Sequence, residues 1–234
     1  MPFIEDILKY KSISFVGMEK NAGKTQTLNY VLSRLRTFSK TIALTSIGVD
    51  GETTDIVTLT SKPEIEIYPN TTFITSQALY PQREIVSAIE EVSTQTTALG
   101  RLIKAKAITQ GKILLAGPSD TVNLKKLIEK LEKNTDLILI DGALSRKTFG
   151  SPSITQAMIL STGASLSASL NVVVKKTKFI YQMTQLPQYE GKHAEQLQQI
   201  ENGIYAITDE EIIDLQIPSL MMIDKYKDKI FDSG

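Results

Sequence analysis

Short apolar runs alternate with helical patterns along this chain, and this alternation limits the folds that are open to it. The runs are bounded by turn residues and are too short for helices, which is typical of strands buried in a parallel sheet. Between them, apolar residues recur at helical spacing, as in Leu28, Val31, Leu32 and Leu35. We therefore expect an α/β fold with three layers, in which a mainly parallel sheet carries helices on both faces.

The pattern predicts elements along the whole chain. Strands are expected at residues 13–16, 41–47, 72–75, 112–116, 137–140, 158–160 and 204–207, and helices from Thr25 and at 85–92, 124–131 and 166–183. Asp120 and Thr121 are expected to cap the helix at 124–131. Residues 48–70 are polar and rich in turn residues, so a mobile loop with a short hairpin is expected there. No linker divides the chain, which predicts a single domain over residues 1–234.

Composition excludes several classes of function. The 234 residues include 26 Lys+Arg and 26 Asp+Glu, so no overall charge attracts nucleic acid. The chain has no cysteine and a single histidine, His193, which removes disulfides, thiolate metal sites and histidine-based triads. Charged residues interrupt the N-terminal apolar residues, and polar residues interrupt the most apolar window, 157–174. We expect a soluble cytoplasmic protein that does not bind membranes.

A glycine-rich segment, Gly17–Thr25, lies between the first expected strand and the first expected helix. Its end, Gly23-Lys24-Thr25, matches the phosphate-loop ending G-K-[ST], in which glycine admits phosphate, lysine neutralises it and the hydroxyl binds Mg²⁺. The usual first glycine is replaced by Met18, and Gly17 stands one residue earlier. A chance Gly-Lys-Thr is the alternative, but the strand before it and the helix after it favour nucleotide binding.

The expected nucleotide-binding residues surround this ending. Backbone N–H groups at the start of the helix complete a cradle for phosphate. Lys20 is a second cation for phosphate, with a solvent-facing side chain as the alternative. The expected set is Gly17, Lys20, Asn21, Ala22, Gly23, Lys24, Thr25 and Gln26.

Two acidic residues are candidates for the metal side of the site. Asp141 ends the apolar run at 137–140 and is followed by Gly142, which places a carboxylate where ligands of open α/β sheets gather. A simple cap after the strand is the alternative. Asp50 follows the second strand and is a candidate to orient water or to hold Mg²⁺, with an ordinary turn aspartate as the alternative. Lys24 and Asp50 are therefore the catalytic candidates, and Thr25, Asp141 and Asp50 are the metal candidates.

The nucleotide base is specified weakly. No N-K-x-D guanine motif is present, because the nearest segment, 172–179, lacks the aspartate that would bind a guanine ring. ATP is therefore favoured over GTP as the cofactor, together with Mg²⁺.

The loop resembles that of dethiobiotin synthetase, with five residues between its glycines and an acidic residue, Glu19, third in the run. This likeness implies the class of P-loop proteins that includes the MinD, ParA and nitrogenase iron-protein families. Glu19 stands where MinD-like members carry a second lysine, and Lys20 is displaced by one. A homodimer is compatible with this class.

Four segments together resemble a narrower family, the reactivase subunits of cobalamin-dependent lysine and ornithine aminomutases. They are 15–25, 45–52, 137–152 and 157–165. The resemblance implies an ATPase that works with a mismatch-repair-like ATPase subunit to restore an aminomutase. The distinguishing residues, Ser145 and Arg146, follow Asp141.

Three functions therefore remain open from the sequence. The first is an ATP-driven switch that acts on a partner protein. The second is a small-molecule kinase or ligase like dethiobiotin synthetase, which would be expected to carry a lysine directly after the second strand, where this chain has Ser46-Ile47-Gly48. The third is a nucleotide-binding module without turnover, since no definite catalytic base is visible.

Overall fold

A computed structural model describes residues 3–19, 21–47, 64–142, 154–187, 189–200, 203–217 and 226–231. The chain divides into two compact units, Met1–Thr184 and Gln185–Gly234. The larger unit holds the central sheet and every described residue of the predicted nucleotide site. The single domain expected over residues 1–234 stays a prediction.

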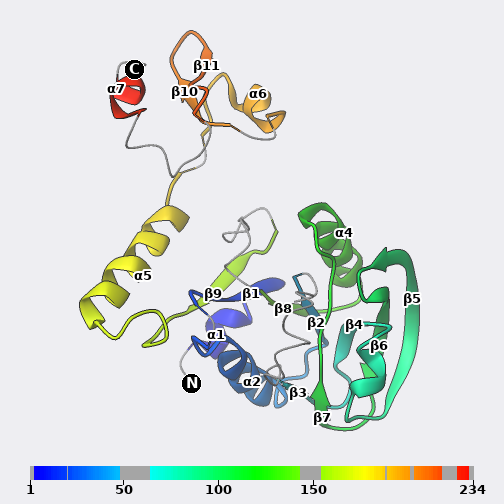
Figure 1. Cartoon of the computed structure of the whole chain (residues 1–234). Helices are drawn as coiled ribbons and strands as arrows, with labels where there is room; N and C mark the ends of the chain where they lie inside the picture. The colour runs from blue at the N-terminus through cyan, green and yellow to red at the C-terminus, as the bar shows by residue number, and fades with distance from the viewer. Residues whose placement is uncertain are drawn as a thin grey trace. The chain divides into compact units, whose positions relative to one another are not determined.

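The larger unit is built on a seven-stranded, mostly parallel sheet (Figure 1). Five neighbouring strands, from β4 to β9 in the sheet order, are parallel, while β6 and β5 add an antiparallel arm beside β4. The expected α/β class with a mainly parallel sheet is thus confirmed. In sheet order the strands are β5 (Ser87–Thr97), β6 (Gly100–Ala107), β4 (Thr72–Ser76), β2 (Ile42–Ser46), β8 (Leu137–Asp141), β1 (Ser12–Gly17) and β9 (Ala157–Ser161).

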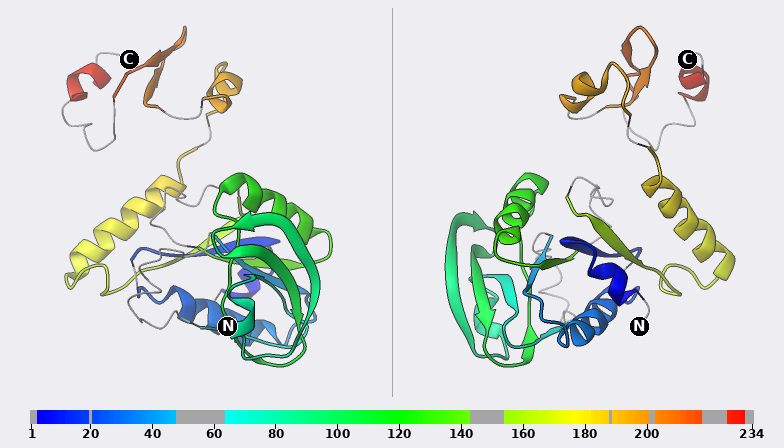
Figure 2. Two further views of the ribbon diagram at one scale, coloured as in Figure 1. Left: turned by 45° about the vertical axis from the view of Figure 1, so that its right-hand side comes forward. Right: turned by 180° about the vertical axis from the view of Figure 1, so that it is seen from behind.

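Two hydrophobic clusters cover opposite faces of the sheet, because successive side chains of a strand point to opposite sides. On β8, Leu137 and Leu139 join the first cluster and Ile138 and Ile140 the second. The first cluster includes α1 (Ile4–Ile7), α2 (Lys24–Leu35) and the small β3–β7 pair, and the second includes α4 (Thr121–Glu132) (Figures 1 and 2). β3 spans Ile65–Ile67, β7 spans Gly111–Ile113, and they pair antiparallel.

The helix α4 begins three residues earlier than expected, with Thr121 as its first helical residue and Asp120 as its cap. The Asp120 carboxylate accepts a hydrogen bond from the Asn123 backbone N–H at 2.8 Å, so Asp120 is the N-cap. Hydrogen bonds from the backbone and then from the side chain of Asn123 lower the pKa of Asp120. Leu124, Ile128 and Leu131 then form the buried stripe of the helix at the expected spacing.

The helix expected at residues 85–92 is wrong, because residues 87–92 belong to strand β5. Its apolar residues Ile85, Ile89 and Val92 do recur at helical spacing. Pairing with β6 gives the backbone its hydrogen bonds instead, and two shifts of register, between Ile89 and Glu91 and between Val92 and Thr96, break the two-residue period of the strand. Tertiary pairing therefore overrides the local pattern.

Three further elements differ in their bounds. β7 ends at Ile113, although the Ala116 N–H still donates to the Ile74 carbonyl at 3.2 Å. α5 (Leu170–Thr184) begins four residues later than expected. Of the loop expected at 48–70, residues 48–63 lie outside the described residues, and the rest contains β3, which pairs with a distant strand.

The smaller unit contains α6 (Ala194–Gln198), α7 (Lys227–Phe231) and an antiparallel pair of β10 (Tyr205–Ile207) with β11 (Ile212–Asp214). β10 confirms the strand expected at 204–207. A short 3₁₀ helix, η1 (Tyr80–Gln82), completes the regular elements of the larger unit. None of the described helices has the length and apolar character needed to cross a membrane.

Candidate functional site

The candidate site lies where parallel strands end at the carboxyl edge of the sheet. Asp141 is in register with both Phe15 and Ser46, so β8 ends between β1 and β2. Gly17 is in register with Ser161 on the other side of β1. The topology therefore gathers Gly17, Asp141 and Ser161 at the edge where open α/β sheets bind ligands.

Gly17 is the point at which the loop turns tightly over the end of β1. A Cβ atom added to Gly17 would lie 3.3 Å from the Glu19 carbonyl oxygen and 3.5 Å from Lys24 Cβ. The loop backbone therefore passes close to position 17, and a side chain there would press on the Glu19 carbonyl. Met18 is accommodated at the usual glycine position, where its N–H donates to the Ser161 carbonyl at 2.9 Å.

The rest of the loop adopts left-handed backbone conformations before α2. Asn21 has φ 61° and Gly23 has φ 87°. Gly23 is the N-cap of α2, and its carbonyl accepts from the Thr27 N–H at 2.9 Å. No acidic residue lies in the first turn of α2. The positive end of this 12-residue helix therefore faces the edge of the sheet without a carboxylate of its own helix to neutralise it.

Lys24 and Asp141 form an ion pair across this edge. The distance from Lys24 Nζ to Asp141 Oδ1 is 2.9 Å, and the two side chains are 20% and 17% exposed. Lys24 and Asp141 are far apart in the sequence, and the fold brings them together. Two partly desolvated charges interact more strongly than a surface pair.

The structure describes some of the other predicted site residues, but not all of them. Thr25 is partly buried in the first turn of α2, while Gln26 is exposed. The Ala22 N–H donates to the Glu19 carbonyl at 3.2 Å and so helps to fold the loop. Lys20 and Asp50 lie outside the described residues, and their roles stay predictions. Within the part of the chain that the structure describes, no three His, Asp or Glu side chains gather as a metal-binding group.

Three hydroxyl residues near the loop are not among the site residues expected from the sequence. The Ser161 carbonyl anchors Met18, and the Ser161 hydroxyl lies 3.5 Å from Thr27 Oγ1. Thr177, on α5, lies 3.3 Å from Met18 Sδ and 3.1 Å from Thr162 Oγ1. The register of β9 with β1 places Ser161 beside Gly17. The packing of α5 brings Thr177 to Met18 and Thr162.

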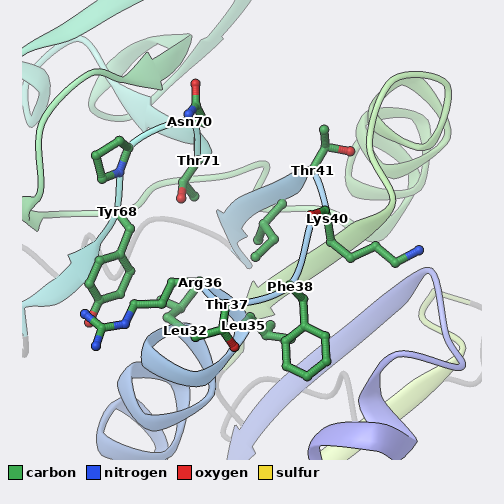
Figure 3. Close-up of a pocket in the computed structure, with 13 residues that line it drawn as sticks. Leu32, Leu35, Arg36, Thr37, Phe38, Lys40, Thr41, Tyr68, Asn70 and Thr71 are labelled. Atoms are coloured by element: carbon green, nitrogen blue, oxygen red, sulfur yellow. The ribbon is translucent and has the colours of Figure 1, made fainter.

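A separate hollow of about 560 Å³ lies at the opposite edge of the sheet (Figure 3). It is lined by the end of α2 and by the segments that precede β2 and β4. The Arg36 guanidinium lies 5.5 Å from the centre of the Tyr68 ring, and the Lys40 side chain points away from both. Its lining shares no residue with the loop at 17–25, so it is no part of the candidate phosphate site.

Comparisons with known proteins found no match to this chain among family models, curated proteins or solved structures. The geometry of the loop and the chemistry of its residues therefore carry the functional argument.

Proposed function

We propose that this protein binds Mg-ATP at the edge formed by β1, β8 and the start of α2, as a three-layer P-loop protein. In this proposal the loop from Gly17 to Gln26 wraps the phosphates, and Lys24 contacts the β- and γ-phosphate oxygens. Thr25 and Asp141 bind Mg²⁺ directly or through its water shell. Asp50 orients the attacking water.

The observation that carries the proposal is the ion pair between Lys24 and Asp141 at the N-terminus of α2. A phosphate site uses a cation, a helix N-terminus and a carboxylate for the metal. Lys24, the start of α2 and Asp141 lie together at one edge of the sheet, which supports the proposal. A chance Gly-Lys-Thr would not be expected to bring its lysine to a strand-end aspartate.

The proposed activity is an ATPase that acts as a switch on a partner enzyme. The partner suggested by the sequence resemblance is a cobalamin-dependent aminomutase with its companion ATPase subunit. This part of the proposal rests on the resemblance, since residues 143–153, which include Ser145 and Arg146, lie outside the described residues.

Calorimetric titration with Mg-ATP tests the binding step. We expect Lys24→Ala to weaken binding by roughly ten- to a hundredfold, because a charge-assisted contact to phosphate contributes about 1.5–3 kcal/mol. Lys40→Ala is a matched control, because Lys40 is exposed and lies at the opposite edge of the sheet. Equal ATP affinity in the wild type and in Lys24→Ala would contradict the proposal.

A further inference from the structure

The hollow of about 560 Å³ at the amino-terminal edge of the parallel strands has the size of a small-molecule site. All of its lining residues belong to the larger unit, so its walls are part of one compact body. Leu32, Leu35 and Ile42 give it a buried apolar base. Polar side chains border this base, which is the usual arrangement in pockets for small organic molecules (Figure 3).

Several polar groups of the lining have no hydrogen-bond partner among the described residues. Thr71 is only 6% exposed, and its hydroxyl forms no hydrogen bond with any described residue. Figure 3 shows the Thr71 side chain directed into the hollow. The Tyr68 hydroxyl and the Asn70 side-chain amide also lack a partner within the described chain. Polar groups in a folded protein are normally paired, so these donors are available to a ligand.

The charge of the lining selects the sign of the ligand. Arg36 and Lys40 are its two cations, and none of its described residues is Asp or Glu. Lys40 Nζ lies 4.0 Å from Asp136 Oδ1, and the Lys40 side chain points away from the hollow (Figure 3). The Arg36 guanidinium lies 5.5 Å from the centre of the Tyr68 ring and forms no ion pair with any described carboxylate. One guanidinium is thus held at the hollow without a counter-charge.

A single guanidinium suits a monocarboxylate better than a dianion. The planar fork of arginine pairs with a carboxylate through two parallel N–H···O bonds. The hollow also lies at the C-terminal end of α2, where the backbone carbonyls carry partial negative charge. This partial charge disfavours a second negative charge on the ligand.

We propose that this hollow binds a small monocarboxylate with an apolar body. The carboxylate pairs with Arg36, and the Thr71 hydroxyl donates to an oxygen of the ligand. The apolar body lies on Leu32, Leu35 and Ile42. This inference goes beyond the proposed nucleotide function and does not depend on it, because the lining shares no residue with the loop at 17–25.

NMR titrations of the full ¹⁵N-labelled chain test the site. The probe is 3-phenylpropanoate, which has one carboxylate and an apolar ring. Three control compounds change one feature each: 3-phenylpropanamide lacks the charge, propanoate lacks the ring, and benzylmalonate adds a second carboxylate. We expect saturable binding of the probe with a dissociation constant of about 1 mM or below. Each control compound should bind at least about tenfold more weakly.

The resonances of the lining decide the location. The Arg36 Nε–Hε signal and the Thr71 amide signal should shift with the same binding curve. Shifts that grow linearly with the probe and never saturate would show a hollow that holds only water, and would overturn the proposal. Tighter binding of benzylmalonate than of the probe would overturn the choice of a monocarboxylate.

Arginine variants identify the group that binds the carboxylate. Arg36→Gln should weaken probe binding about tenfold or more, and Arg36→Lys should also weaken it, because lysine keeps the charge but not the planar fork. The matched control is Arg34→Gln. Arg34 lies in the last turn of α2 and 5.3 Å from the centre of the Tyr30 ring, but it does not line the hollow. Equal probe binding by Arg36→Gln and the wild type would overturn the proposal.

Thr71→Val tests the buried hydroxyl without a change of charge. Valine keeps the shape of threonine, so we expect probe binding to weaken about three- to tenfold through the lost hydrogen bond. Thermal unfolding is measured in parallel, because Thr71 is buried. Arg36 is exposed, so its variants test the site even if Thr71→Val does not fold. Unchanged binding by folded Thr71→Val would contradict the role of this hydroxyl.

Lys24→Ala in the same titration separates this site from the candidate phosphate site. We expect Lys24→Ala to keep the probe affinity of the wild type, and Arg36→Gln to keep its affinity for Mg-ATP. Probe binding without ATP binding would leave the hollow as a site and contradict the nucleotide proposal. Loss of probe binding in Lys24→Ala would assign the carboxylate to the phosphate loop and would overturn the inference.

Discussion

The ion pair between Lys24 and Asp141 sets the electrostatic state of the site in the absence of nucleotide. Both charges are about four-fifths buried, and each gives the other a partner at 2.9 Å. A nucleotide that binds without metal must draw Lys24 away and must place its phosphates near the Asp141 carboxylate, which repels them. In the proposed complex, Mg²⁺ would remove this penalty because it would give Asp141 a new positive partner.

Replacing Asp141 should therefore have opposite effects with and without metal. We expect Asp141→Asn to lose most of the Mg²⁺-dependent tightening of ATP, while its affinity for metal-free ATP rises by roughly fivefold, the equivalent of about 1 kcal/mol for a partly exposed ion pair. Calorimetry in EDTA and in Mg²⁺ measures both changes. Asp50→Asn is the comparison, because we expect it to slow turnover and to retain the tightening by metal. Loss of metal dependence in Asp50→Asn alone would show that the two roles are reversed.

At the level of single elements, the N-cap residue Asp120 of α4 contributes to the stability of the fold through its hydrogen bonds. The Asp120 carboxylate accepts from the Asn123 N–H and from the Asn123 side chain, each at 2.8 Å. These bonds lower the pKa of Asp120, so its stabilising effect belongs to the ionised form. A lowered pKa means that the effect is complete above the pKa of the unfolded chain and is lost as the pH falls through the pKa of the folded state.

Asp120→Ala should thus lower the free energy of unfolding in a pH-dependent way. We expect a loss of about 0.5–1 kcal/mol at pH 7, the usual cost of removing an exposed N-cap. The difference between wild type and variant should shrink as the pH falls below about 4, where aspartate becomes protonated. Denaturant titrations at several pH values measure this difference in the free energy of unfolding. Asp120→Asn is the control, because asparagine keeps a capping oxygen at all pH values. A loss of constant size down to pH 2 would contradict the cap as its source.

The sequence predicts the elements near the site well because their signals are local. Strand β1, the loop, α2 and the run into Asp141 each have a pattern within a few residues, and each is found where it is expected. Strand β5 and the position of Thr177 could not be predicted in this way. The first depends on pairing with β6 and the second on the packing of α5 near β9, and both contacts join residues that no local period relates.

At the scale of the whole molecule, the candidate site lacks an arginine within its phosphate loop. Phosphoryl transfer depends on positioning and on stabilising charge in the transition state. Lys24 supplies one positive charge, and Lys20 is a second candidate outside the described residues. A group supplied by a partner can raise the rate by roughly 10³–10⁵-fold. In the proposed switch, the partner enzyme would supply such a group.

We therefore expect slow ATP hydrolysis by the protein alone, on the order of 10⁻⁴–10⁻² per second, and a large acceleration by its partner. The measurement compares turnover of the full chain alone, with candidate small carboxylate metabolites, and with a cobalamin-dependent aminomutase together with its companion ATPase. The opposite result would be that a small carboxylate accelerates ATP hydrolysis and yields a phosphorylated product, while the aminomutase and its companion ATPase have no effect. That result would identify a kinase or ligase.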